Sequence, residues 1–486
     1  MRMLFAGRFI LLCTIVLATT GASTLTQHDL LAKMRTINGG LYNMHIVSTS
    51  EHVIDGVTAQ AVTEASGLRF VVRECSGELC IGNYFDGSRL FQFNFNGTLL
   101  PPRDQPVRYL RALRILAMLS FLDPQFGAGG GDITDGGAAA FDGVRCRRLL
   151  VSSPGAEPFA AYIDPRTALV AGAKGLEEDW TIRFSDYRHV AAFALPFAID
   201  YNGAPLERYS SRTIVAAPLN APHGLTPSFH ATPTPGMALD PTSVSPLGTC
   251  KIAGVEARCL IDTGNSGLSM SLQLVEKLNL HPIGMLPIAG LGSYSTEVVR
   301  AGPLEIGNAD FGDANYFVLS DAERYGYDLV VGADVLADTP VTIDYQRHLL
   351  TFGDSDPVSQ SNMLPVHFEK FIPVVNVTLD GKPAQLAVDT GDESNINLAY
   401  AYYLKHSDLF SITSTAPVGG VGGLSVEDLG ELPEIRLGGI TAQNQPIGTT
   451  RTLQGTADGH LGAAFLSKFK AIVLDYPREQ LYLAPL

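Results

Sequence analysis

The stretch RCLIDTGNSGLS, residues 258–269, governs the interpretation of this chain, because its core recurs as QLAVDTG at residues 385–391. Each copy is an apolar run, typical of a buried strand, that ends in Asp-Thr-Gly. The two aspartates, Asp262 and Asp389, lie 127 residues apart. Two further pairs of phrases recur at nearly this spacing: LVVGADVL (329–336) with HLGAAFL (460–466), and VTIDY (341–345) with IVLDY (472–476). The sequence therefore predicts an internal duplication of a unit of about 120 residues.

These repeated motifs resemble those of the pepsin and retropepsin aspartic proteases, in which an apolar strand leads into Asp-Thr-Gly and a later apolar-apolar-Gly turn packs behind it. The resemblance covers residues 237–486 and implies a bilobal, mainly β fold built from two tandem repeats. It implies that Asp262 and Asp389 are the catalytic pair and that the substrate is a peptide or a protein. It also implies that the catalytic loops are supported by Thr263, Gly264 and Gly332 in one copy and by Thr390, Gly391 and Gly462 in the other, with the two threonines hydrogen-bonded to each other.

The chemistry explains why two carboxylates are needed. Two carboxylates in contact cannot both ionise cheaply, so one keeps a proton and the other does not. The ionised group can take a proton from a water molecule while the protonated group donates to the carbonyl oxygen of the peptide bond. Because both aspartates belong to one polypeptide, we expect a monomer that contains an intramolecular pseudo-dimer.

Two features of the repeats bear on whether the site is intact. The residue after Asp-Thr-Gly, where the family usually has Ser, Thr or Ala, is Asn265 in the first copy and Asp392 in the second. Asp392 adds a third carboxylate, which we expect to disturb the charge balance of the pair. Two glycine-rich segments are candidates for flaps that cover a substrate, namely IAGLGSY (288–294) and VGGVGG (418–423), with Gly290, Gly292, Tyr294, Gly420 and Gly422 as the candidate residues.

Composition excludes several other classes of function. The formal net charge of −15 argues against a nucleic-acid partner, because nothing offsets the repulsion of phosphates. The sequence contains no His/Cys spacing typical of zinc sites, no phosphate-binding glycine loop and no serine-nucleophile elbow. We therefore predict a site without a metal or any other cofactor.

The N-terminus predicts export. Residues 1–22 combine an early positive charge, a short apolar core and a small-residue cleavage site, which is the pattern of a secretory signal peptide. The mature protein is then expected to be periplasmic or secreted, where disulfides are permitted. Cys75 and Cys80 are candidates for one disulfide. Cys250 and Cys259 are candidates for another, because a two-residue turn at Gly254-Val255 would place them directly opposite each other in a hairpin.

The N-terminal half of the chain has a different pattern. Residues 26–37 predict a helix, and short β-rich runs follow it, interrupted by a second helical segment at 108–122. A helix followed by a meander of strands, together with the phrases YFDG and YIDPRTALV, resembles the periplasmic lipoprotein-carrier fold over residues 25–216. That resemblance implies an α+β half-barrel wrapped around helices, which in that family shelters an acyl chain. For this domain a lipid or lipoprotein ligand, a structural platform and a partner-docking module are the alternatives.

The predicted domains are a signal peptide (1–22), an N-terminal α+β domain (23–216), a proline-rich linker (217–236), the first protease repeat (237–354), a short linker (355–362) and the second repeat (363–486). The resulting hypothesis is an exported aspartic endopeptidase. Two alternatives stay open: a non-catalytic peptide-binding protein that retains the protease fold, and a lipid or lipoprotein carrier that acts through its N-terminal domain.

Overall fold

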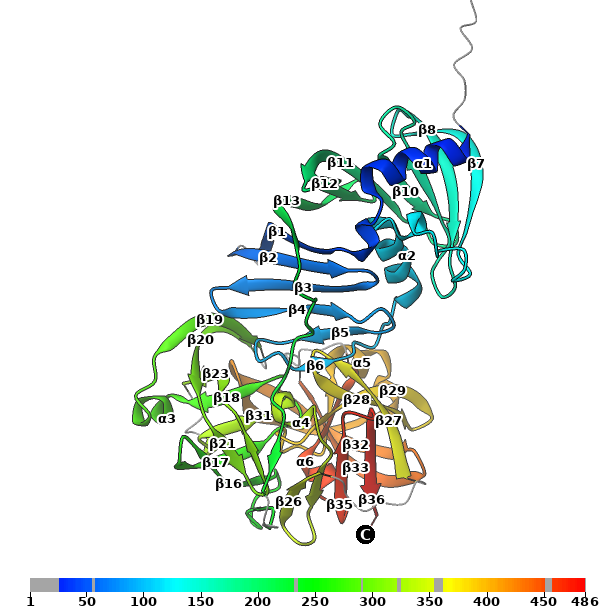
Figure 1. Cartoon of the computed structure of the whole chain (residues 1–486). Helices are drawn as coiled ribbons and strands as arrows, with labels where there is room; N and C mark the ends of the chain where they lie inside the picture. Colours follow the sequence, from blue (N-terminus) through cyan, green and yellow to red (C-terminus); the bar gives the residue numbers. More distant parts are fainter. Residues whose placement is uncertain are drawn as a thin grey trace, which may run out of the picture.

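The computed structural model describes residues 26–54, 57–230, 235–289, 292–320, 325–353, 362–450 and 457–485. The chain is mainly β, as predicted. It contains one large sheet in its N-terminal part and two more in its C-terminal part. In Figure 1 the N-terminal part is the upper body and the C-terminal part is the lower body.

The N-terminal sheet has thirteen strands, all paired antiparallel, in the order β6-β5-β4-β3-β2-β1-β13-β12-β11-β10-β9-β8-β7. Consecutive strands are thus neighbours in the sheet, except that β6 and β7 form its two opposite edges and β13 pairs with β1. The strands are β1 (His45–Ile54), β2 (Val57–Ser66), β3 (Arg69–Ser76), β4 (Leu79–Phe85), β5 (Leu90–Phe93), β6 (Leu99–Leu100), β7 (Asp132–Phe141), β8 (Val144–Ser152), β9 (Phe159–Ile163), β10 (Val170–Gly175), β11 (Thr181–Val190), β12 (Phe193–Tyr201) and β13 (Ala204–Val215).

Two helices bury their apolar faces against this sheet. They are α1 (Gln27–Asn38) and α2 (Val107–Ala117), each followed by a short 3-10 turn, η1 (Leu41–Asn43) and η2 (Ser120–Leu122). The helix α1 begins at Thr26, which forms a capping box with Asp29 and so satisfies the first free N–H groups of the helix. Leu30 of α1 and Leu116 of α2 are buried in one apolar cluster with Trp180 of the region before β11.

The C-terminal part contains the two stretches that the sequence predicts to be repeats, called here the first and the second repeat. The first contains β14 (Ser228–Phe229), β15 (Met237–Ala238), β16 (Leu247–Ile252), β17 (Val255–Ile261), β18 (Leu268–Ser271), α3 (Leu272–Lys277), β19 (Pro282–Ala289), β20 (Ser293–Ala301), β21 (Leu304–Ile306), β22 (Ala309–Phe311), β23 (Ala314–Leu319), β24 (Leu329–Val331), α4 (Ala333–Leu336), β25 (Val341–Asp344) and β26 (Leu349–Phe352). The second contains β27 (Met363–Glu369), β28 (Ile372–Leu379), β29 (Lys382–Asp389), β30 (Ile396–Ala399), α5 (Tyr400–Lys405), η5 (Ser407–Leu409), β31 (Ser411–Gly420), β32 (Gly423–Leu437), β33 (Ile440–Thr450), β34 (Gly459–Gly462), α6 (Ala463–Leu466), β35 (Ala471–Asp475) and β36 (Gln480–Ala484).

One sheet joins the two repeats. In it, β25 of the first repeat pairs antiparallel with β35 of the second. On either side the order is mirrored, with β26 and β15 beyond β25, and β36 and β27 beyond β35. These six strands are therefore arranged symmetrically about the β25–β35 pair, and beyond β27 the sheet continues through strands of the second repeat alone. Ile343 and Ile472, which face each other in this pairing, are fully buried in the core that both repeats share.

The hairpin β16–β17 corrects one expectation from the sequence. Cys250 faces Ala257 and not Cys259, because the turn residues are Ala253 and Gly254. Both have positive φ angles, 50° and 76°, which a two-residue turn that follows the twist of a hairpin requires. Cys250 and Cys259 are instead diagonal neighbours with their Cα atoms 5.9 Å apart, and the structure joins them in a disulfide.

The other cysteines lie in the N-terminal part. Cys75 and Cys80 face each other across the β3–β4 hairpin and form a disulfide. Cys146 is buried as a free thiol. Within the described residues, no helix combines the length and the apolar character needed to cross a membrane.

The N-terminal part is docked on the first repeat through a polar contact. Asp334 of α4 is almost completely buried, with 1% of its surface exposed. Its carboxylate accepts hydrogen bonds from Asn94 Nδ2 at 2.6 Å, Asn96 Nδ2 at 2.5 Å and Thr98 Oγ1 at 2.5 Å. All three donors belong to the turn between β5 and β6. A buried carboxylate is tolerated only when it is hydrogen-bonded, so this turn completes the first repeat.

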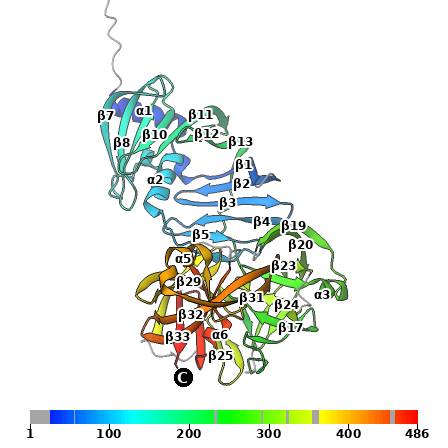
Figure 2. The same ribbon diagram turned by 180° about the vertical axis from the view of Figure 1, so that it is seen from behind.

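Apolar and charged contacts extend the same interface. Leu79, beside the Cys75–Cys80 disulfide, packs with Val298 and Phe317, so the β3–β4 hairpin lies against the β19–β20 hairpin. Figure 1 and Figure 2 show these two hairpins side by side from opposite directions. On the second repeat, Arg103 Nη1 donates to Gln385 Oε1 at 2.5 Å. The N-terminal part thus contacts both repeats.

We predict that Thr98→Val destabilises the protein by about 1.5–3 kcal/mol, because it removes a hydrogen bond to a buried carboxylate while nearly preserving the shape of the side chain. The free energy of unfolding would be measured from urea denaturation followed by circular dichroism.

The matched control is Thr134→Val, which removes a hydrogen bond of 2.8 Å from an exposed threonine to Asp132. That change should stay within about 0.5 kcal/mol. If both substitutions lower the free energy of unfolding equally, the hydrogen bond to Asp334 contributes no more to stability than an exposed one.

Candidate active site

Two equivalent strands deliver the two aspartates to the same place. Asp262 directly follows β17, and Asp389 is the last residue of β29. Each strand is covered on one side by a parallel partner from the apolar-apolar-Gly motif, β24 for β17 and β34 for β29. The runs before the aspartates are buried, so the strands are central ones and their ends are fixed by packing.

The two carboxylates face each other across the repeat boundary, because each lies directly against the glycine that follows the other Asp-Thr pair. Asp262 Oδ1 accepts the N–H of Gly264 at 2.8 Å, and Asp389 Oδ1 accepts the N–H of Gly391 at 3.0 Å. A Cβ atom on either glycine would collide with the aspartate of the opposite repeat. Glycine is therefore required here because the facing carboxylate comes so close.

Thr263 and Thr390 lock the two loops together, in the arrangement that the family resemblance implies. Each backbone N–H donates to the hydroxyl of the other threonine, at 3.1 and 3.0 Å. Each hydroxyl then donates across the repeat boundary, Thr263 to the carbonyl oxygen of Val388 at 2.5 Å and Thr390 to that of Ile261 at 2.7 Å. Both threonines are fully buried, so these groups have no water to replace a lost partner.

The two motif glycines pack behind the catalytic loops. Gly332 donates its N–H to the carbonyl oxygen of Gly267 at 2.9 Å, and Gly462 donates to that of Asn395 at 3.0 Å. A Cβ atom at either position would collide with backbone oxygens of the loop in front of it. In each repeat the backbone of the glycine motif therefore lies directly against the backbone of the catalytic loop, which leaves no room for a side chain.

The flap candidates lie in two β-hairpins, β19–β20 and β31–β32. The tips of these hairpins meet, because the N–H of Gly292 donates to the carbonyl oxygen of Val421 at 3.2 Å and the backbone of Gly422 lies directly against Gly292. Tyr294 is the second residue of β20, and Gly420 pairs with Gly423 at the end of the other hairpin. Gly290 lies outside the described residues.

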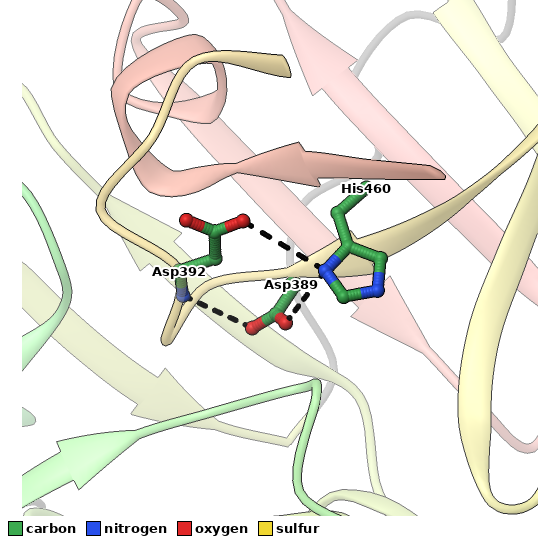
Figure 3. A group of neighbouring side chains, drawn as sticks. All are labelled: Asp389, Asp392 and His460. Atoms are coloured by element: carbon green, nitrogen blue, oxygen red, sulfur yellow. Dashed lines mark hydrogen bonds and ion pairs between the residues drawn. The ribbon is translucent and has the colours of Figure 1, made fainter. Parts of the chain in front are cut away.

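Sequence reasoning missed one residue of this site. His460, the first residue of the second apolar-apolar-Gly motif, places its Nδ1 atom 3.3 Å from Asp389 Oδ2 and 3.7 Å from Asp392 Oδ2 (Figure 3). The first repeat has Val330 at the equivalent position, one residue before the equivalent Val331-Gly332. The sequence did contain a signal for this residue, because the motif has an apolar residue at the position that His460 occupies.

The cluster has strongly shifted proton affinities. Burial raises the pKa of Asp262 well above its usual range, and the charge of Asp389 raises it further. Burial alone would also raise the pKa of Asp389, but the hydrogen bond and the charge of His460 bring it below its usual value. Burial alone would lower the pKa of His460, but Asp389 and Asp392 together raise it to about 10. His460 is thus a cation at neutral pH.

Asn265 and Asp392, the residues after the two Asp-Thr-Gly motifs, have different surroundings. The amide group of Asn265 donates to Ser269 Oγ at 3.3 Å, and no hydrogen bond from it to Asp262 is present in the described site. Asp392 brings a third carboxylate, but His460 brings a positive charge that faces it. The expected disturbance of the charge balance is therefore offset by a residue of the second repeat itself.

The same three side chains define a geometry that could hold a metal ion. Ligand atoms of Asp389, Asp392 and His460 all lie within 4.8 Å of one another, and no other such group occurs among the described residues. Metal binding requires a deprotonated imidazole, so an ion would have to displace the proton that the two carboxylates hold on His460. That the site works without a metal stays a prediction.

Part of this region is similar to a known protein family. Residues 248–335, which contain Asp262 and its loop, match the family model described as aspartyl protease. This part of the chain therefore has an aspartyl protease-like fold. No curated protein matches the chain.

Solved structures resemble separate parts of the chain. A retropepsin-like aspartic protease from Rickettsia conorii is 17% identical, and the match covers 25% of this chain and 87% of that one with a TM-score of 0.19. A LolA superfamily protein from Nitrosomonas europaea is 12% identical, with 40% and 96% covered and a TM-score of 0.29. A putative outer membrane lipoprotein-sorting domain from Vibrio parahaemolyticus is 9% identical, with 39% and 93% covered and a TM-score of 0.25. Likenesses at these scores carry no argument about function.

We predict that Thr390→Val costs about 1–3 kcal/mol of unfolding free energy for each buried group that it leaves without a partner, here the carbonyl oxygen of Ile261 and the N–H of Thr263. Urea denaturation of the purified protein would measure the loss. Thr390→Ser keeps the hydroxyl and serves as the control. A valine variant as stable as the serine variant would contradict a role of these hydrogen bonds in holding the repeats together.

Proposed function

We propose that this chain is an aspartic endopeptidase in which Asp262 and Asp389 form one catalytic dyad within a single polypeptide. The observation that carries the proposal is the close approach of the two carboxylates at the ends of equivalent strands, where each packs against the glycine that follows the other aspartate. Their pKa values shift in opposite directions, as expected for a pair that shares one proton. The interlocked threonines and the two hairpins that meet at their tips complete an arrangement suited to a peptide held in an extended conformation.

The reaction follows from the shared proton. The ionised carboxylate accepts a proton from a water molecule as the water oxygen attacks the carbonyl carbon of the peptide bond. The protonated carboxyl group donates its proton to the carbonyl oxygen, which becomes a hydroxyl. The carbon–nitrogen bond then breaks as the nitrogen takes the proton that came from water and leaves as an amine. At the same time a hydroxyl of the tetrahedral intermediate returns its proton to the dyad and its oxygen becomes the carbonyl oxygen of the new carboxyl group. Water is consumed and the dyad regains its single proton, so no metal or covalent intermediate is needed.

The main alternative is a binding protein that retains the cleft without cleaving its ligand. A pepstatin-type mimic of the transition state separates the two. It should inhibit peptide cleavage by a peptidase with an intact dyad, whereas a binding protein shows no cleavage that could be inhibited. A lipid or lipoprotein ligand for the N-terminal part stays a prediction from the sequence, and mass spectrometry of bound lipids in the purified protein would test it.

We predict that Asp262→Asn and Asp389→Asn each lower kcat by about 10⁴-fold, and that the double variant is no worse than either single one, because groups that act as a unit are strongly non-additive. Cleavage of a peptide library by the purified mature protein would measure this. Asparagine keeps the shape of the side chain and removes the repulsion between the carboxylates, so the fold should persist.

The control is Asp344→Asn, which makes the same chemical change in the VTIDY phrase, outside the dyad. It should retain full activity. Because the dyad is intramolecular, a mixture of the two single variants should stay inactive. A single variant with nearly normal turnover would refute the shared mechanism.

We also propose that the protein is exported. The sequence of residues 1–22 supports this, and so do the two disulfides, which persist in oxidising compartments. We predict that the mature protein begins near Ser23 and fractionates outside the cytoplasm. N-terminal sequencing of exported material would test this, and retention of Met1 there would contradict it.

A further inference from the structure

The two repeats differ at the positions that surround the dyad. The first repeat places Val330 and Asn265 there, and the second places His460 and Asp392. Val330 lies in an apolar cluster, whereas His460 faces two carboxylates. The second repeat thus carries a histidine and an acid where the first has two uncharged residues. In a symmetric dyad the two carboxylates would have equal proton affinities. The charged residues of the second repeat make these affinities unequal.

The hydrogen bonds show how the charged pair is oriented. Asp389 uses Oδ1 to accept the N–H groups of Gly391 and Asp392, at 3.0 and 3.1 Å. Asp392 uses its own Oδ1 to accept the N–H of Ser394 at 2.8 Å. In each carboxylate the backbone therefore holds one oxygen, and the other oxygen, Oδ2, points toward His460 Nδ1 (Figure 3).

The charges of the site balance when His460 is included. A dyad with one proton carries one negative charge, Asp392 adds a second, and a protonated His460 cancels one of them. The net charge is then that of a dyad alone. Two further titratable groups face the site: Glu427, whose pKa is raised by burial and by the charge of Asp392, and the buried Tyr476, whose pKa is raised by burial and by both dyad carboxylates. Both shifts favour the uncharged forms of these groups.

We propose that His460 and Asp392 act as positioning residues that keep the negative charge of the dyad on Asp389 and leave the shared proton on Asp262. This assignment rests on the proposed peptidase function. Asp389 is then the group that takes the proton from the attacking water, and Asp262 is the group that donates to the carbonyl oxygen. Asp392 holds the imidazolium in place and, by adding a negative charge, keeps it protonated.

The consequence is a predictable pH dependence. The imidazolium attracts the negative charge on Asp389, so the first proton leaves the dyad at lower pH than it would without His460. Activity that needs one proton on the dyad therefore begins at lower pH. Without the imidazolium, Asp389 faces Asp392 with no compensating charge, and the acid limb of the pH profile must move upward.

The test is a cycle of three variants that converts the second repeat to the pattern of the first. His460→Val should raise the acid limb of the kcat/KM profile by at least about one pH unit, which is a tenfold loss of activity at a fixed pH on that limb. Asp392→Asn should move the limb in the opposite direction, because a negative neighbour of Asp389 is lost. The double variant removes both charges and should lie nearer to the wild type than His460→Val does.

A second variant and the shape of the pH profile distinguish a charge effect from a loss of folding. His460→Gln keeps a polar side chain of similar size without a charge and should shift the limb in the same direction, so it serves if the valine variant folds poorly. A merely structural role would lower activity equally at every pH and leave the limb in place. A limb that stays in place in both variants would overturn the proposal.

Failure of the peptidase proposal would look different. Histidine-selective NMR of the wild type and of His460→Val assigns the imidazole of His460 and gives its pKa without any substrate. A value close to 10 supports the ion pair, and a value near 6.5, the usual one, overturns it. If His460 titrates near 10 and no peptide is cleaved, the peptidase function fails and the ion pair stands.

Discussion

The contact between two buried carboxylates is the constraint on which the protease-like part of this protein depends. Asp262 and Asp389 repel each other whenever both are ionised, and burial makes that repulsion stronger. A pair of this kind persists only if the backbone around it is fixed more firmly than the repulsion can displace it. The interlocked hydrogen bonds of Thr263 and Thr390 provide that fixation directly behind the carboxylates. The antiparallel pairing of β25 with β35 also joins the two repeats.

The sequence predicted the part of this arrangement that is periodic. Two copies of a strand that ends in Asp-Thr-Gly, each followed by its glycine motif, predicted the duplication and the elements that carry the two aspartates. The mainly β class is confirmed, and the boundaries of α1 lie within one residue of the predicted helix at 26–37. These features are local, since they depend on the spacing of apolar residues and on caps such as Thr26.

The features that the sequence did not predict are those that depend on orientation or on distant contacts. The turn of the β16–β17 hairpin was displaced by one residue, and a one-residue slip exchanges every facing pair in a hairpin. The role of His460 escaped because a motif position does not say what its side chain will face. The partners of Asp334 escaped as well, because Asn94 and Thr98 lie more than 230 residues away in the chain.

These last two residues are related, because each repeat carries an ionisable side chain at a motif position where the other has an apolar residue. The first has Asp334 where the second has Ala464, and the second has His460 where the first has Val330. A buried charged or polar group must find partners. His460 finds them in the dyad itself, inside the repeat pair. Asp334 finds them in the turn between β5 and β6, outside it.

Because of this difference, the first repeat depends on the N-terminal part for the hydrogen bonds of a buried carboxylate. Asp334 lies two residues after Gly332, which packs against the loop that holds Asp262. Without the N-terminal turn, that carboxylate would lose its three donors directly behind one half of the dyad. The two halves of the dyad are thus supported from different directions, Asp262 through the N-terminal part and Asp389 through His460. A dimer of identical single repeats could not provide two different supports, whereas a duplicated chain can.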